Sequence, residues 1–365
     1  MRNILLAAVL ALPCVRAFGG EGGERIKVSG KPLHARIAAE SGAKAGGVLW
    51  TSPTSDKLKA SFDKLFFQGV VQNQDIKIQA SLLSDQGWGP WVDAELDVSP
   101  NGRFWAQIQI SGKAGQQVRL RALSATGAHD NAELFGFETA ANEGETGGAA
   151  GNPRLEAADN GTTAPPPPAQ TVAPQAPTVL PRSAWGAKKA TKPYEPMLPD
   201  RISVHHTEAF QAFSQTDAAQ EMRVIQNFHQ KGRGWIDIAY HFVIDGSGRI
   251  WEGRPVGVVG AHVKNKNDGN IGISLMGDFH APKNNQPSMA QIQSLVTLLK
   301  YLTAKYQIPV SRIKGHRDQE DTSCPGDILY ARLDDIRRQT STGSVAFAVP
   351  DATAIDLAFR GLLTQ

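Results

Sequence analysis

Histidine and cysteine side chains are the groups in this 365-residue sequence whose types and spacing could do chemistry. Seven of the nine histidines lie between residues 205 and 316. His205 is expected at the end of a short strand, whereas His316 and Cys324 lie in one loop-like run, eight residues apart. Two imidazoles and a thiolate suit zinc, and three protein ligands leave a fourth position for water. The set therefore indicates a catalytic metal site, with an inert buried Cys324 as the alternative.

The cysteine count narrows the chemistry further. The sequence holds two cysteines, Cys14 and Cys324. Two thiols exclude a disulfide scaffold and an iron–sulfur cluster held by four thiolates. A structural zinc site would need a fourth protein ligand. Because Cys14 falls in a segment that we expect to be removed, Cys324 is expected to be the only thiol of the mature chain.

Residues 1–17 have the features of a secretory signal peptide. A short basic start precedes the apolar run from Ile4 to Leu12, and Val15–Ala17 is an acceptable cleavage site. The apolar run is too short to span a bilayer, and no other stretch predicts a transmembrane segment. We expect a secreted or periplasmic protein. The alternative, a lipoprotein signal modified at Cys14, fits the preceding Leu12-Pro13 poorly.

The composition of the sequence and a proline-rich segment predict how the chain is divided into domains. The charge balance of 38 basic and 35 acidic residues gives no reason to expect nucleic acid as a partner, and a hydrophobic content of 41% is enough to bury cores. Residues 141–178 hold seven prolines and no aromatic residue, so they predict an extended linker. It separates a domain at 24–140 from one at 179–340, and residues 341–365 form a C-terminal tail.

The N-terminal domain is predicted to be a smaller, all-β, sandwich-like domain. Apolar residues alternate with polar ones near residues 76–80, 104–110 and 118–122, and Ser99–Gly102 predicts a turn. Three of its four tryptophans, Trp88, Trp91 and Trp105, could form a platform on which sugars stack. The alternative is ordinary packing, the more common use of tryptophan.

The C-terminal domain is predicted to be α/β, with a central mixed β-sheet flanked by helices. Strands are expected at 202–204, 240–244, 250–252 and 271–276, with a hairpin turn at Asp245–Gly248. Helices are expected from Ser214 or Thr216 to about Gln230 and from Ser288 to Tyr306, where apolar residues recur at helical spacing.

From about residue 181 to 338, less than half of its length, the chain resembles the peptidoglycan recognition protein and type 2 amidase family. Members with activity are zinc-dependent N-acetylmuramoyl-L-alanine amidases. The resemblance depends on the order and spacing of several stretches. These are Pro181–Gly186, Val204–Thr207, Met222–His229, Gly234–Phe242, Gly253–Arg254, Gly260–His262, Ile271–Ile273, Gly315–Asp318 and Thr322–Gly326.

The resemblance implies particular roles for the central residues. His205, His316 and Cys324 would bind Zn²⁺, and Tyr240 would donate a hydrogen bond to the oxyanion that forms on the scissile carbonyl. Thr322 would lie near the bound water, at a position where the family has lysine or threonine. The implied reaction is hydrolysis of the amide between N-acetylmuramic acid and L-alanine of peptidoglycan. The alternative is a recognition protein that only binds peptidoglycan, although such members usually lack the cysteine.

The resemblance also implies a substrate groove. Its expected lining residues are Thr207, His229, Trp235, Arg254, His262 and Asn267. Arg254 could pair with a carboxylate of the stem peptide, since a guanidinium can bind a carboxylate bidentately. The alternatives are a packed Trp235, a loop-stabilising His262 and a solvated Arg254. Lys266 falls near the position that reads the third stem-peptide residue, but the segment departs from the family pattern and predicts no preference between diaminopimelate and lysine.

Overall fold

The structure is a computed structural model that describes residues 24–38, 44–71, 76–127, 131–141, 175–281 and 283–341. The expected signal peptide at 1–17, most of the linker at 141–178 and the tail beyond 341 lie outside the described residues. The described chain divides into two compact units. The first contains residues of 24–96 and 106–141, and the second contains residues 97–105 and those of 175–341.

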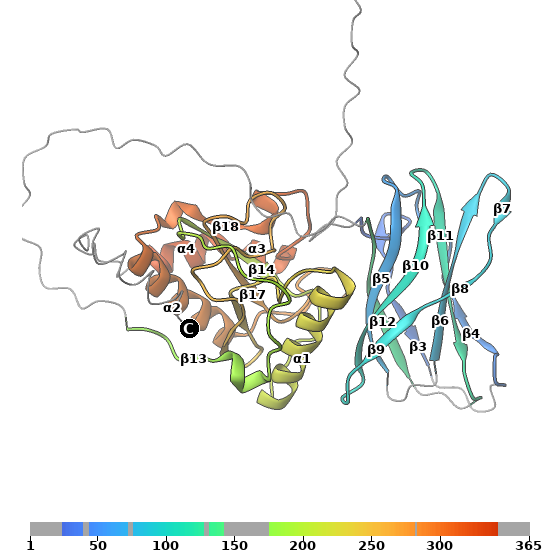
Figure 1. The fold of residues 1–365 in the computed structure, drawn as a ribbon, viewed down its shortest axis with the longest axis horizontal. Coiled ribbons are helices and arrows are strands. Elements are labelled where there is room, and N and C mark those ends of the chain that lie inside the picture. The colour runs from blue at the N-terminus through green and yellow to red at the C-terminus, as the bar shows by residue number, and fades with distance from the viewer. Residues whose placement is uncertain are drawn as a thin grey trace, which may run out of the picture. The chain divides into compact units, whose positions relative to one another are not determined.

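Strands make up the first unit. Its elements, together with the ends of β9 and β10 that extend into residues 97–105, are β1 (Lys27–Val28), β2 (Lys31–Pro32), β3 (Ala35–Ile37), β4 (Val48–Thr51), β5 (Phe62–Val71), β6 (Ile76–Ser84), β7 (Gly87–Trp88), β8 (Val92–Asp93), β9 (Glu95–Val98), β10 (Arg103–Gly112), β11 (Gln117–Ser124) and β12 (Ala132–Ala140). One five-stranded sheet has the order β3-β12-β5-β10-β9, and the other has β4-β11-β6-β7 with β8 paired to β6. Figure 1 shows the strands of both sheets side by side.

The strands expected from alternation in the first unit are β6, β10 and β11. In β11 the buried side chains include Val118, Leu120 and Ala122, which lie on one face of the strand. In β10 the alternation is lost at its start, where Phe104, Trp105 and neighbouring residues are all buried.

Of the three tryptophans expected to form a sugar platform, Trp88 and Trp91 each have an arginine guanidinium over the ring. The Arg119 guanidinium lies 4.1 Å from the ring centroid of Trp88 and 4.8 Å from that of Trp91. Arg121 lies 4.2 Å from the centroid of Trp91. Such cation–π contacts stabilise the sheet surface. Because a stacked sugar needs an open ring face, this geometry favours packing over a sugar platform, and Trp105 is buried.

The second unit contains one six-stranded sheet and the helices around it. Its elements are β13 (Val179–Leu180), η2 (Arg182–Trp185), β14 (Arg201–His206), α1 (Gln215–Asn227), the π-helix η3 (Phe228–Gly232), β15 (Phe242–Ile244), β16 (Ile250–Glu252), β17 (Asn270–Leu275), α2 (Met289–Tyr306), η4 (Val310–Arg312), β18 (Ile313–Gly315), η5 (His316–Asp318), α3 (Asp327–Tyr330) and α4 (Leu333–Ser341). The strand order is β13-β16-β15-β17-β14-β18. Only the β15–β16 pair is antiparallel among these described pairs, so the predicted mixed sheet is confirmed.

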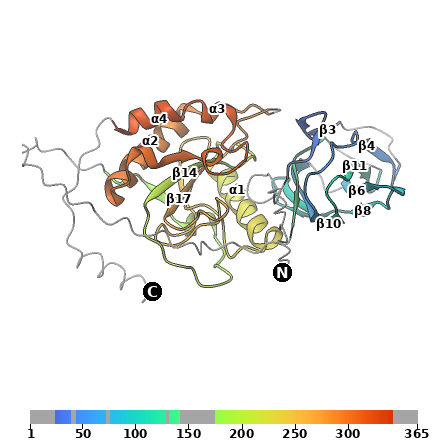
Figure 2. The ribbon, with the colours of Figure 1, turned by 90° about the horizontal axis from the view of Figure 1, so that it is seen from above.

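Helices cover both faces of this sheet. One core joins the apolar residues of β14 and β17 to Leu295 and Leu299 of α2 and Ile336 of α4. The other joins Met222 of α1 to Val243 of β15 and its neighbours. Figures 1 and 2 show α2 and α4 together on one side and α1 on the other. With both faces covered, β17 is buried along its whole length, as is typical of parallel strands in α/β proteins.

The ends of the two long helices follow from their capping residues. The Ser214 side chain accepts a hydrogen bond from the Asp217 amide at the start of α1. Ser288 and Gln291 form a capping box at the start of α2, which ends at Tyr306 as predicted. The first helix was predicted to continue to about Gln230, but α1 passes into the π-helix η3 at Phe228. None of the described helices is long and apolar enough to cross a membrane.

Candidate metal centre

Two adjacent parallel strands bring His205 and His316 together. β14 and β18 pair with Val204 opposite Gly315, and each histidine is the residue that follows. Both side chains are buried, and their ring centroids are 4.5 Å apart. The closeness of two residues that are far apart in sequence is therefore a consequence of strand register.

Cys324 completes what we call the first cluster, His205, His316 and Cys324. One ligand atom from each residue lies within 4.8 Å of the others, and all three residues are buried. Nδ1 of His205 is 3.6 Å from the Cys324 sulfur. The His206 amide donates to the same sulfur at 3.4 Å, and the Arg317 amide donates to the Cys324 carbonyl at 3.0 Å. The structure thus brings together the three metal ligands expected from the sequence.

The first cluster fits a zinc ion. Nδ1 of His316 is buried and has no hydrogen-bond partner among the described residues, while Nε2 of the same ring is 2.9 Å from Oε2 of Glu320. A buried nitrogen without a partner is costly, so this geometry suits a nitrogen that binds a metal. Two imidazoles and a thiolate match the donors of catalytic zinc sites.

His205 is held from behind by His262. Nε2 of His205 is 3.1 Å from Nδ1 of His262, and Nε2 of His262 is 2.9 Å from the Asn270 carbonyl oxygen. A carbonyl can only accept, so His262 carries its proton on Nε2 and accepts from His205 through Nδ1. His205 therefore presents an unprotonated Nδ1 to the cluster.

Burial keeps these imidazoles neutral. It lowers the pKa of His205 well below its ordinary value, and the neighbouring His316 and His262 lower it further. Burial is also the main cause that lowers the pKa of His262, with His241 adding to it. Metal binding requires neutral imidazole, so the environment favours the ligating form at neutral pH.

Three aromatic rings extend from His205. The buried Tyr240 ring lies 5.4 Å from His205 and 5.9 Å from His229, measured between ring centroids. Trp235 lies 5.0 Å from His229 and is half-buried. The Ala239 amide donates to Nδ1 of His229 at 3.1 Å, which fixes that ring. Tyr240, His229 and Trp235 thus lie on one side of the first cluster.

Thr322 and Thr207 are both half-buried and make local hydrogen bonds. The Thr322 hydroxyl accepts from the Cys324 amide at 3.2 Å, so it helps to position the sulfur. The Thr207 hydroxyl accepts from the Gly277 amide at 3.2 Å, next to the end of β17. These contacts assign each threonine a place near the ligand-bearing segments.

Two of the expected groove residues stabilise backbone instead. His262, 1% exposed, lies behind His205, so the structure differs from the expected substrate contact. The buried Asn267 accepts through Oδ1 from the His262 and Val263 amides at 2.8 and 2.9 Å. Its side chain therefore closes the loop that holds His262.

Arg254 was expected either to bind a stem-peptide carboxylate or to be solvated, and its environment fits neither expectation. Its side chain is 1% exposed, and the guanidinium donates to the carbonyl oxygens of Ile238, Val259 and Asp237 at 2.6, 2.8 and 3.3 Å. It is neither solvated nor open to a stem-peptide carboxylate. Because Ile238 lies two residues before Tyr240, Arg254 holds the segment that carries Tyr240.

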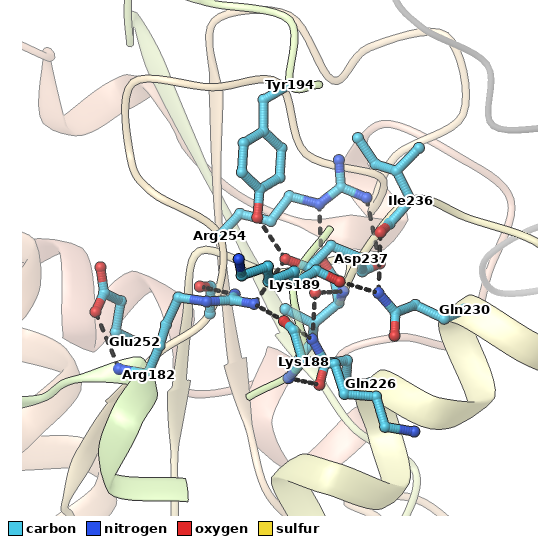
Figure 3. A network of polar contacts seen from close by, with 12 residues as sticks. Arg182, Lys188, Lys189, Tyr194, Gln226, Gln230, Ile236, Asp237, Glu252 and Arg254 are labelled. Atoms are coloured by element: carbon cyan, nitrogen blue, oxygen red, sulfur yellow. Dashed lines mark hydrogen bonds and ion pairs between the residues drawn. The ribbon is translucent and has the colours of Figure 1, made fainter. Parts of the chain in front are cut away.

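The Asp237 carboxylate is the centre of the surrounding polar network, shown in Figure 3. It accepts from the Tyr194 hydroxyl at 2.5 Å and from the Gln226 amide at 2.6 Å, and it pairs with Arg182 at 2.9 Å. Burial and the bond to Asp237 raise the pKa of Tyr194, which stays protonated as a donor. The network joins the start of the unit to α1 and to the segment before Tyr240.

Glu320 is a residue of the site that was not among the residues expected from the sequence. Its carboxylate holds Nε2 of His316, an arrangement common behind metal-binding histidines. The sequence feature that could have identified Glu320 is its position four residues after His316, because the turn of the chain at η5 brings the two side chains into contact.

Known proteins resemble the region that contains this cluster. A family model described as N-acetylmuramoyl-L-alanine amidase matches residues 194–327. Peptidoglycan-recognition protein LB of Drosophila melanogaster is 36% identical over 158 residues, which are 42% of this chain and 67% of that protein. Peptidoglycan-recognition protein SC2 of the same species is 35% identical over 160 residues, 43% of this chain and 84% of that protein.

A mammalian relative carries the enzyme's name. The N-acetylmuramoyl-L-alanine amidase of Sus scrofa is 34% identical over 165 residues, which are 43% of this chain and 27% of that protein. The matches leave more than half of this chain uncovered. The extent of the Drosophila matches is sufficient to show that the chain belongs to the family of peptidoglycan-recognition proteins and N-acetylmuramoyl-L-alanine amidases.

Proposed function

We propose that this protein is a zinc-dependent N-acetylmuramoyl-L-alanine amidase, which hydrolyses the amide between N-acetylmuramic acid and L-alanine of peptidoglycan. The observation that carries the proposal is the first cluster, in which the His205, His316 and Cys324 donors converge. The family includes proteins named for recognition and proteins named for amidase activity. The presence of Cys324 favours the enzyme, since members that only bind usually lack the cysteine.

The residues of the first cluster would hold the metal in a defined state. His205 and His316 would bind through Nδ1, because His262 and Glu320 occupy the vicinity of the other nitrogens. Cys324 would bind through its sulfur, which the His206 amide helps to orient. Zinc, when bound, acidifies a water molecule and polarises the scissile carbonyl.

Tyr240 would supply the second electrophilic group. Its ring lies beside His205, and the peptide segment before it is held by Arg254. A fixed phenol can donate a hydrogen bond to the oxyanion that develops when the amide carbonyl is attacked. Trp235 and His229 would line the approach for the glycan or the stem peptide, and Thr322 would keep Cys324 in position.

The proposal is tested with the purified full chain and intact sacculi. We expect the release of stem peptides with a free L-alanine amino terminus, its loss after chelation, and its return when zinc is added. Cys324→Ser should abolish release, whereas Thr297→Ala, which removes an exposed hydroxyl bonded only to its own helix, should not. Binding to sacculi without release by the zinc-loaded wild type would identify a recognition protein instead.

We also propose that the protein acts outside the cytoplasm, with residues 24–140 as an accessory β domain, 141–178 as a linker and 179–340 as the amidase domain. The basic and apolar start of the sequence supports export. Mass spectrometry of the protein from the producing cell should give a mature chain that begins at Phe18. An unprocessed amino terminus in all cell fractions would refute export by a cleaved signal.

A further inference from the structure

The opposite face of β14 carries a second group of metal-binding side chains. His205 and His206 are consecutive residues of the strand, so their side chains point to opposite faces. On the His206 side lie Asp278 and His280, and one ligand atom from each of these three buried residues lies within 4.8 Å of the others. We call His206, Asp278 and His280 the second cluster.

The distances within the second cluster are close to those around a single ion. Oδ1 of Asp278 is 3.2 Å from Nδ1 of His280 and 4.0 Å from Nδ1 of His206. Ligand atoms at about 2.1 Å from one tetrahedral zinc ion lie about 3.4 Å from one another. The Asp278–His280 pair already has about this separation, and Nδ1 of His206 would have to come about 0.6 Å nearer to Oδ1 of Asp278.

His206 presents the required nitrogen because Glu208 holds the other one. Nε2 of His206 is 3.0 Å from Oε1 of Glu208, so the proton lies on Nε2 and Nδ1 faces Asp278. The Phe279 amide donates to Nδ1 at 3.3 Å, a long hydrogen bond that shows Nδ1 to be an unprotonated acceptor. A carboxylate behind an imidazole is the arrangement that Glu320 gives His316 in the first cluster.

The loop that supplies the other two donors is ordered by its own hydrogen bonds. The Asp278 amide donates to Oδ1 of Asn285 at 2.9 Å, and the Asn285 amide donates to the Asp278 carbonyl at 2.9 Å. The turn before Asp278 uses Gly277 at φ 141°, where a Cβ atom would lie 2.7 Å from the Phe279 ring. The donors are thus held near one another by the fold.

The loop of the second cluster also packs against the segment of Cys324. The Ile328 amide donates to the Phe279 carbonyl at 3.0 Å, and a Cβ atom at Gly326 would lie 2.6 Å from the Phe279 carbonyl carbon. The His206 amide meanwhile donates to the Cys324 sulfur. An ion held by the second cluster would therefore fasten together the end of β14, the loop after β17 and the Cys324 segment.

We infer that His206, Asp278 and His280 form a second divalent-metal site that supports the first cluster. Two imidazoles and a carboxylate favour a borderline transition-metal ion such as zinc over magnesium or calcium, which prefer all-oxygen sites. The second cluster lies on the opposite face of β14 from His205 and uses none of the donors of the first cluster. Metal binding there therefore does not require the proposed amidase activity.

Metal stoichiometry tests this site on the full chain. Metal-free protein is dialysed to equilibrium against buffered zinc, and bound zinc per chain is measured by mass spectrometry of the element. We expect two zinc ions in wild type, one in His280→Ala and one in Cys324→Ser. The matched control is His34→Gln, which removes a histidine–carboxylate pair of the first unit and should keep two.

Two further measurements test metal binding at the second cluster. If circular dichroism shows that His280→Ala does not fold, Asp278→Asn replaces it and should weaken the second ion at least about tenfold. With cobalt as the probe, the thiolate-to-metal absorption should account for one of two bound ions and vanish in Cys324→Ser, which retains the other. One ion in wild type, or two undiminished ions in the folded second-cluster variant, would overturn the second site. Neither result depends on cleavage of sacculi.

Discussion

Each histidine of the first cluster turns Nδ1 toward the other donors because a neighbouring group holds Nε2. His262 does this for His205, and Glu320 does it for His316. The chosen nitrogen sets the direction of the lone pair, and the buried partner keeps the ring from rotating. The chemistry of the ligands therefore depends on residues that would not themselves touch the metal.

His262 should matter for metal affinity more than for substrate binding. His262→Ala removes the acceptor behind His205, and we expect zinc affinity at the first cluster to fall about 10- to 100-fold. Competition with a chromogenic chelator measures this. His262→Gln, which can still accept from His205, should recover part of the loss, and unchanged affinity in both variants would exclude the positioning role.

Tyr240 should matter for the rate and not for the metal. Tyr240→Phe removes one donor to the oxyanion, so kcat on a soluble muropeptide should fall about 10²- to 10³-fold. Zinc content should equal that of wild type. A variant with normal kcat would remove Tyr240 from the reaction, whereas a loss of zinc would show that the ring serves the site's structure.

At the scale of elements, the register of three parallel strands brings the ligand-bearing positions together. β14 lies between β17 and β18, and Val204 is paired with both Ile273 and Gly315. His205, His316 and the loop that begins at Gly277 consequently meet at the same edge of the sheet. A one-residue slip of β17 or β18 against β14 would move the side chains of the slipped strand to the opposite face of the sheet.

The segment before Tyr240 depends on Arg254. Arg254→Ala leaves three carbonyl oxygens in a buried region without their donor, and we expect a loss of about 3 kcal/mol or more in the free energy of unfolding, measured with urea. Arg312→Ala, which breaks an exposed pair with Asp200, should cost about 1 kcal/mol or less. If Arg254→Ala keeps wild-type stability and loses stem-peptide binding, Arg254 would instead be a substrate-binding residue, as the sequence predicted.

At the scale of the whole molecule, buried neutral histidines couple folding to pH. Burial lowers the pKa of His241 from 6.5 to about 4, and it also lowers the pKa values of His205 and His262. Between pH 6.5 and the lowered pKa of each ring, the unfolded chain binds more protons than the folded chain. The stability that depends on these neutral rings is therefore complete above about pH 6.5 and decreases as the pH falls, and for His241 the loss extends down to about pH 4.

The pH dependence of metal-free protein tests this coupling. For His241 alone, whose pKa falls from 6.5 to about 4, the loss amounts to at most about 3.5 kcal/mol, at about 1.4 kcal/mol for each pKa unit. His241→Leu should be less stable at pH 7, because the Gly272 amide and the Val258 carbonyl lose their partner. Its unfolding free energy should nevertheless decline less steeply between pH 6.5 and 4, and an equal slope would contradict the assignment.

Local patterns were enough to predict several elements and the three residues that meet in the first cluster. Helix α2 was predicted from the helical spacing of its apolar residues, a signal that acts within a few residues, and the structure adds the capping box at Ser288. The hairpin between β15 and β16 was predicted from Asp245–Gly248. The set of His205, His316 and Cys324 was predicted because their types suit zinc and their positions lie at strand ends or in a loop.

Only the tertiary structure decided the partners and the exposure of these side chains. The burial of Arg254, the place of His262 behind His205 and the meeting of His206 with Asp278 and His280 depend on residues from different strands and loops. A hydrogen bond needs both distance and direction, and across the sheet these are set by strand register and packing. The sequence by itself therefore determined which donors could bind a metal, and the folded chain determined which nitrogen of each histidine faces the other donors.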